Sequence, residues 1–126
     1  MERWPVPSVE LNTAMVAKIL YRAAERVELG WAQYPHGYLA GPRRIVGHRE
    51  QAACLVEHVT RAAREVLGLS GFVPVDVLWA IQRPLHELIR MEIGYGLTDW
   101  NDAPGRTPEE VSALCVAGAE LVEART

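Results

Sequence analysis

The first part of the chain repeats apolar residues with the period of an α-helix. Asn12 or Thr13 can cap a first helical turn through a side-chain oxygen. From there, apolar residues recur three or four positions apart, which lines one face of a helix. They are Val16, Ile19, Leu20, Ala23, Ala24 and Val27. Gly30 is expected to end this helix in a left-handed conformation. Residues 1–11 contain two prolines and are expected to form an N-terminal arm.

Helical periodicity is absent from residues 31–47, where aromatic residues, proline and glycine replace it. This composition is typical of a loop, and we expect an insertion that packs aromatic side chains onto the helices. Two stretches inside it, Tyr38–Ala40 and the pair Ile45 and Val46, can each form a brief strand. The segment is therefore predicted to be one aromatic loop or a short hairpin.

Two further apolar stripes predict helices in the middle of the chain. The first runs from about His48 to Leu67, and Gly68 is expected to close it. Its apolar positions are Ala52, Leu55, Val59, Ala62, Ala63 and Val66. The second begins at Asp76 as N-cap, and its inward positions are Leu78, Ile81, Leu85, Leu88 and Ile89. Pro84 either kinks one helix or separates two, because proline removes a backbone donor and crowds the preceding turn.

The last helix has the clearest start signal. Thr107 is an N-cap residue, Pro108 suits the first helical position, and Glu110 can complete a capping box. The buried stripe is predicted at Val111, Leu114, Gly118, Leu121 and Val122. Together the patterns predict one mainly α domain of 126 residues. We expect a compact, bundle-like or orthogonal arrangement of four to five helices.

Composition places the chain among ordinary globular proteins. Hydrophobic residues make up 49% and charged residues 23% of the sequence, which suffices for one core. Neither a secretory signal nor an apolar run of about 20 residues is present, so we expect a cytoplasmic protein without membrane insertion. The net charge of -3 disfavours nucleic acid as a partner. Lys18 is the only lysine beside many arginines, which indicates a GC-rich genome.

The candidate chemistry lies in the second predicted helix. Glu50, Cys54 and His58 recur at four-residue intervals, which would place them along one side of that helix. A thiol beside an imidazole can act as an activated nucleophile, so Cys54 and His58 are weak catalytic candidates. Such a pair also needs an oxyanion site and an orienting group. The competing interpretation is a small packed hydrophobe at Cys54 and a surface histidine at His58.

Motifs for metals and cofactors are missing from the sequence. No two of the four histidines have paired helical spacing or an HExxH context: His36, His48, His58 and His86. Phosphate loops, dinucleotide fingerprints and nucleophile elbows do not occur. Cys54 and Cys115 lack CxxC spacing and are expected to stay thiols in a reducing cytoplasm. We expect no metal, cofactor or disulfide, and the sequence leans away from an enzyme.

Residues 97–107 form the most distinctive segment. Asn101 and Asp102 suit an Asx-type turn, and the Pro-Gly pair that follows suits a reverse turn. In the architectural interpretation, Trp100 plugs the core while the polar residues fix a tight connection. In the functional interpretation, the turn is one wall of a binding pocket. The residues around that pocket would be Trp31, Gln33, Trp100, Asn101 and Asp102.

Two signatures in this sequence resemble an uncharacterised family of small proteins from actinobacteria and their phages. One is Gly30-Trp31 with Gln33 after an Ala-rich helix, and the other is the turn from Trp100 to Asp102 before the final helix. Members of that family also have a central cysteine-containing helix, which matches Cys54 here. The resemblance implies a similar source and fold, and it carries no activity.

We therefore expect a non-enzymatic interaction protein that binds a host protein and is phage or mobile-element encoded. The aromatic, proline-containing loop carries residue types that are enriched at interface hot spots. The expected binding residues are Trp31, Gln33, Tyr34, Tyr38, Trp100, Asn101 and Asp102. The alternative is a small enzyme or ligand-binding domain that uses Cys54 and His58. Small residues at Ala117, Gly118 and Ala119 favour a homodimer through the last helix, unless the first helix covers them.

Overall fold

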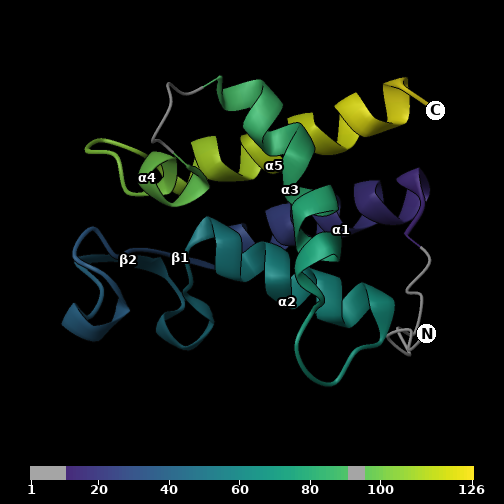
Figure 1. Cartoon of the computed structure of the whole chain (residues 1–126). Coiled ribbons are helices and arrows are strands. Elements are labelled where there is room, and N and C mark those ends of the chain that lie inside the picture. The colour runs from purple at the N-terminus through teal and green to yellow at the C-terminus, as the bar shows by residue number, and fades with distance from the viewer. Residues whose placement is uncertain (1–10, 91–95) are drawn as a thin grey trace, which may run out of the picture.

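The computed structural model describes residues 11–90 and 96–126 (Figure 1). The predicted arm, residues 1–11, lies almost entirely outside the described residues. The helices are α1 (Thr13–Leu29), α2 (Leu55–Leu67), α3 (Val75–Ile89), α4 (Leu97–Asn101) and α5 (Pro108–Ala124). The strands are β1 (Gly30–Gln33) and β2 (Arg44–Gly47), and short 3-10 turns span Tyr38–Ala40 and Arg49–Gln51. The mainly α, compact architecture is confirmed.

Helix α1 lies at the centre of the core. The Asn12 side-chain oxygen accepts a hydrogen bond from the Met15 amide at 2.9 Å and caps the first turn. Every position of the predicted apolar stripe is buried, from Val16 to Val27. Its most extensive contacts are with α5, which runs alongside it, and the next with α2 (Figure 1). The sequence pattern therefore identified the helix around which the others pack.

The chain leaves α1 without the predicted left-handed glycine. Gly30 is extended, with φ -171° and ψ 138°, and β1 begins at this residue. A Cβ atom built on Gly30 would lie only 2.5 Å from the His48 carbonyl oxygen. Glycine is needed here because two backbone segments approach closely. Helix α1 does end at Gly30 as predicted, but the expected left-handed conformation was wrong.

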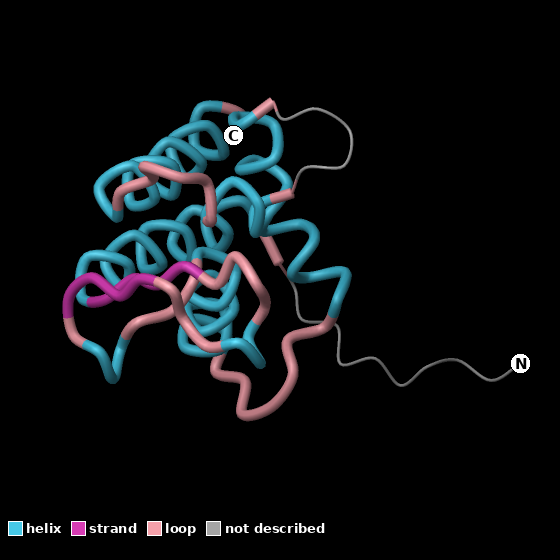
Figure 2. The backbone as a smooth tube through the Cα atoms, turned by 90° about the vertical axis from the view of Figure 1, so that its left-hand side faces the viewer, coloured by secondary structure: helices cyan, strands magenta, loops and turns pink. Residues whose placement is uncertain are grey.

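Residues 31–47 contain a short hairpin. The strands β1 and β2, magenta in Figure 2, pair antiparallel. Trp31 lies opposite Val46, and Gln33 lies opposite Arg44. The strand prediction for Ile45 and Val46 is confirmed, whereas Tyr38–Ala40 is a 3-10 turn. Every residue of β1 is buried, which explains why its sequence lacks the alternation of a half-exposed strand.

Helix α2 begins at Leu55, seven residues after the predicted start at His48. The preceding chain is held beside β1, because the Ala32 amide donates to the Ala53 carbonyl oxygen at 3.1 Å. That contact keeps the backbone extended and delays the helix. Its end is confirmed, since Gly68 is left-handed with φ 67°.

Helix α3 is one continuous helix that contains Pro84, so the alternative of two separate helices is wrong. It begins at Val75, with Pro74 rather than Asp76 in the capping position. The predicted inward residues Ile81 and Leu85 are fully buried. Leu88 differs from its prediction, because its side chain is 38% exposed.

Helix α5 has the predicted capping box. The Glu110 amide donates to Thr107 Oγ1 at 3.2 Å, and the Thr107 amide donates to Glu110 Oε1 at 3.0 Å. Its buried face is rotated from the predicted one and comprises Pro108, Val111, Ser112, Cys115, Gly118 and Ala119. A Cβ atom on Gly118 would lie 2.6 Å from Leu85 Cδ2. The close approach expected of these small residues is thus made within the chain, by α1 and α3.

Candidate functional site

The two signature segments of the sequence bind each other. The indole Nε1 of Trp31 in β1 donates to Asn101 Oδ1 at the end of α4, at 2.7 Å. Both side chains are fully buried, although 70 positions separate them along the chain. The hairpin is therefore joined to the α4 turn inside the protein.

Asn101 uses its whole hydrogen-bonding capacity in this contact. Its Oδ1 accepts from Trp31 Nε1 at 2.7 Å and from the Leu55 amide at 3.1 Å. Its Nδ2 donates to the Ala32 carbonyl oxygen at 3.1 Å and to Asp102 Oδ1 at 3.0 Å. A carboxamide has two N–H donors and two acceptor lone pairs. None of them is left for a ligand.

The bond from Leu55 also explains how α2 starts. Cys54 occupies the N-cap position of α2, but its side chain makes no capping hydrogen bond. The first amides of a helix need acceptors from elsewhere, and Asn101 supplies one from a distant turn. One asparagine therefore fixes the positions of β1, α2 and α4.

Further bonds align the hairpin on the turn after α4. Gln33 Nε2 donates to the carbonyl oxygens of Asn101 at 3.0 Å and Ala103 at 3.1 Å. The Tyr34 amide donates to Asp102 Oδ1 at 3.0 Å. The polar side chains of both signatures thus form hydrogen bonds that join the two segments.

Trp100 lies outside this buried network. It is only half-buried, and the Arg106 guanidinium carbon lies 3.8 Å from its ring centroid. Arg106 Nε donates to the Trp100 carbonyl oxygen at 2.9 Å, and Arg44 Nη1 donates to the Arg106 carbonyl oxygen at 2.7 Å. Trp31, rather than the predicted Trp100, is the tryptophan that fills the core.

The predicted binding residues separate into three groups by exposure. Trp31, Gln33 and Asn101 are buried. Tyr34, Trp100 and Asp102 are half-buried, and Tyr38 is 61% exposed. Six of the seven are gathered at the junction of the hairpin and the α4 turn, while Tyr38 lies on the connection between the strands.

Cys54 and His58 lie one helical turn apart at the start of α2, and the side-chain contact described for each is with another residue. Cys54 precedes α2 and is 4% exposed, with the Tyr38 hydroxyl oxygen 2.7 Å from its sulfur. His58 Nε2 lies 2.6 Å from the Gly30 carbonyl oxygen, and the residue is fully buried. Glu50 lies in the exposed turn before α2, so the three residues share no helix face. The premise of one helical side was wrong.

His58 has the environment of a neutral core histidine. Burial lowers its pKa to about 4, because the charged imidazolium would lose its hydration. Since a carbonyl oxygen can only accept, Nε2 is the nitrogen that carries the proton. The structure describes no partner for the other ring nitrogen, Nδ1. Within the described ranges, no three His, Cys, Asp or Glu side chains are grouped to hold a metal ion.

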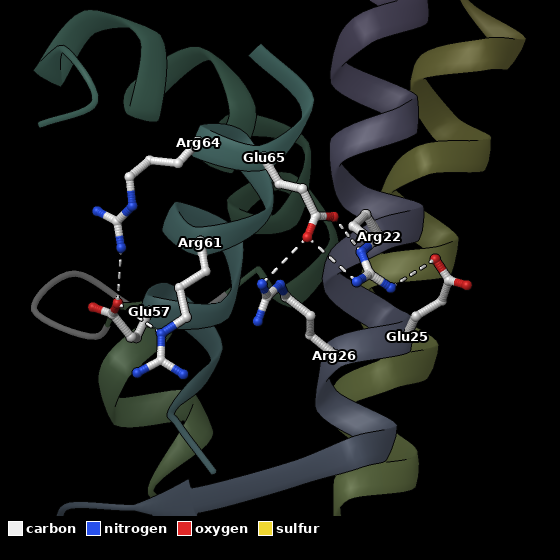
Figure 3. Close-up of polar contacts among 7 residues, drawn as sticks. All are labelled: Arg22, Glu25, Arg26, Glu57, Arg61, Arg64 and Glu65. Atoms are coloured by element: carbon white, nitrogen blue, oxygen red, sulfur yellow. Dashed lines mark hydrogen bonds and ion pairs between the residues drawn. The ribbon is translucent and has the colours of Figure 1, made fainter. Parts of the chain in front are cut away.

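The arginines of α2 are balanced by acidic neighbours (Figure 3). Glu57 accepts from Arg61 at 3.1 Å and lies 3.5 Å from Arg64. Glu65 is paired with Arg22 and Arg26 of α1, and its hydrogen bond from Arg22 lowers the pKa of its carboxyl group. The Glu65 pairs join α1 and α2 at the surface, whereas the Glu57 pairs lie within α2. Surface ion pairs of this kind each contribute little to stability.

The connection between β1 and β2 is ordered by its own contacts. We call residues 35–42 the hairpin tip. The Gly37 amide donates to the Tyr34 carbonyl oxygen and the Gly41 amide to the Tyr38 carbonyl oxygen, both at 3.0 Å. The rings of Tyr34 and Tyr38 lie 4.6 Å apart. Within the hairpin tip, the side chain of Leu39 is fully exposed.

A second exposed apolar surface lies on and before α3, and sequence analysis missed it. Phe72 is 99%, Val75 70% and Trp79 64% exposed. The available signal was position, because Trp79 falls off the stripe defined by Leu78 and Ile81. An aromatic residue off the buried face of an amphipathic helix indicates a surface contact.

These features define a small helical protein with an internally joined hairpin and two exposed apolar surfaces. The chain belongs to a family of unknown function, DUF6197, whose sequence profile matches residues 12–121. The match includes both joined segments and the five helices of the described residues, except the end of α5. No curated protein and no solved structure matches the chain. Among the described residues, no helix has the length and apolar character that crossing a bilayer requires.

Proposed function

We propose that this protein is an interaction protein that binds another protein through the hairpin tip. The observation that carries the proposal is Leu39, a large apolar side chain held fully in solvent beside the 61% exposed Tyr38. A single exposed leucine is common on protein surfaces. Leu39 is adjacent to an exposed tyrosine, and contiguous exposed apolar surface is typical of an interaction site. A tyrosine at the centre of such a surface is a frequent hot spot.

The tip is already ordered in the free protein. Tyr38 is held against Cys54 and Tyr34, and the Tyr34 amide is bound by Asp102. Binding would therefore immobilise few additional groups, which reduces the entropy lost on association. The buried network around Asn101 supports binding by positioning the tip, without contacting the partner.

The charges beside the tip define the partner's chemistry. Arg43 and Arg44, which directly follow the tip in the sequence, are exposed, in a chain whose net charge is -3. A basic border around an apolar tip complements a protein surface that has an apolar pocket and an acidic border. Both cysteines are free and buried, which suits a reducing cytoplasm.

We further propose that the gene belongs to an actinobacterium or one of its phages, and that the partner is a host protein. The arginine-rich, lysine-poor composition supports a GC-rich source. The two signatures, which resemble those of a family from actinobacteria and their phages, support the same source.

Affinity capture from an actinobacterial lysate, followed by titration of the purified captured protein, tests the proposal. Leu39→Asp should weaken binding at least about 30-fold, as expected for a hot-spot residue. Phe72→Asp introduces the same charge at another fully exposed apolar position and serves as the matched control. A partner that binds Leu39→Asp and wild type equally, or loses affinity equally in both variants, would contradict the proposal.

A further inference from the structure

We infer that the exposed face of α3 binds the same face of a second copy of this chain, with the two helices antiparallel around a two-fold axis. This face is distinct from the hairpin tip. Its residues surround an open hollow of about 870 Å³, and they are Val75, Asp76, Trp79, Ala80 and Arg83. The proposal does not depend on the function proposed for the tip.

Helix α3 buries one side and leaves the other without a partner in the described chain. Ile81 and Leu85 are fully buried against the core. On the outer side, Val75 is 70% and Trp79 64% exposed. The ring of His86 is stacked with that of Trp79, with the two ring centroids 6.1 Å apart. A tryptophan held in solvent on a regular helix face is suited to a contact that removes it from water.

The charges on this face complement themselves. Asp76 and Arg83 stand on either side of Trp79 and Ala80, seven residues apart, which corresponds to about 10 Å along a helix. Neither side chain forms an ion pair with any residue that the structure describes. One end of the face is therefore acidic and the other basic, with apolar surface between them.

An antiparallel pairing satisfies both the charges and the shapes. A two-fold axis between Trp79 and Ala80 places Asp76 of each copy opposite Arg83 of the other, which forms two equivalent ion pairs. The same axis places each Trp79 against the small Ala80 of the partner copy. A closed interface of this kind requires each patch to complement itself, and this sequence of residues does.

Sedimentation equilibrium of the full chain across micromolar concentrations tests the inference. The 14.0 kDa chain should reach twice that mass. Asp76→Arg replaces both ion pairs by arginine pairs and should raise the dimer dissociation constant at least about tenfold. Arg83→Asp should do the same, and the double variant should restore dimerisation because the pairs re-form with exchanged charges. Glu28→Arg, an equal charge change at an exposed position of α1, should have no effect.

All the altered side chains are exposed or at the helix surface, so the variants should fold. Circular dichroism measures their helical content and so distinguishes an unfolded variant from a folded monomer. A monomer at every concentration would overturn the inference and leave the α3 face to a different protein. A dimer that persists in Trp79→Ser and in both single charge reversals would also overturn it, by locating self-association elsewhere. The restored dimer in the double variant is the result that a foreign partner would not produce.

Discussion

Replacing Asn101 with alanine should destabilise the protein far more than loss of an ordinary polar contact. The substitution removes four hydrogen bonds in the buried network. It leaves the Trp31 indole N–H, the Leu55 amide and the Ala32 carbonyl oxygen buried without these partners. Each unsatisfied buried group costs about 1–3 kcal/mol, so the expected loss is about 3–9 kcal/mol. That is comparable to the total stability of a domain, about 5–15 kcal/mol.

Urea unfolding followed by circular dichroism measures this loss as a difference in the free energy of unfolding. The matched control is Asn12→Ala, which removes one exposed capping bond to the Met15 amide. Loss of an N-cap costs about 1 kcal/mol. If Asn101→Ala costs no more than Asn12→Ala, the buried network does not hold the hairpin on the helices, and the reasoning fails.

Three further predictions concern buried groups. The pKa of His58 is lowered to about 4 in the folded protein, so the unfolded state binds the proton more readily. The stability of the protein therefore falls as the pH drops from about 6.5 toward 4. Between pH 7 and pH 5, the unfolding free energy of the wild type should fall by about 2 kcal/mol more than that of His58→Gln. Gly118→Val should lower the free energy of unfolding by about 2 kcal/mol, because the added side chain overpacks against Leu85. The control Ala117→Val should lower it by less than about 1 kcal/mol, and equal losses of stability in thermal unfolding would refute the packing argument. Cys54 and Cys115 are buried, so a thiol reagent at neutral pH should label both only after unfolding, and stoichiometric labelling of the native protein would contradict the burial.

Local signals in the sequence identified the elements whose structure depends on nearby residues. The Thr107 capping box and the apolar stripe beginning at Val16 describe contacts within one helix, so the pattern alone was sufficient. Gly68 likewise ends α2 through a local left-handed conformation. These features required no knowledge of what packs against them.

The errors arose where distant segments decide the conformation. Gly30 ends α1 as predicted, but it is extended rather than left-handed, and the close approach of His48 is what requires glycine there. The start of α2 at Leu55 depends on Asn101, 46 positions away. A sequence pattern reports propensity and periodicity, whereas tertiary contacts determine where an element starts.

The candidate site shows the same division. The sequence signatures around Trp31 and Asn101 were correctly singled out as unusual, yet nothing in them showed that they bind each other. Helical spacing linked Glu50 to Cys54 and His58 only on the assumption that α2 began earlier. Exposure of Leu39 could not be read from composition, because the same residue type fills the core elsewhere.

Site-specific photocrosslinking tests the central claim most directly. A photoreactive amino acid placed at Leu39 reports what touches the hairpin tip in the cell, and the same amino acid at the exposed Glu28 is the control. The account predicts one heavier adduct with a single other protein from position 39, and none from position 28. Equal or absent adducts at the two positions would contradict the proposal that the tip binds a partner.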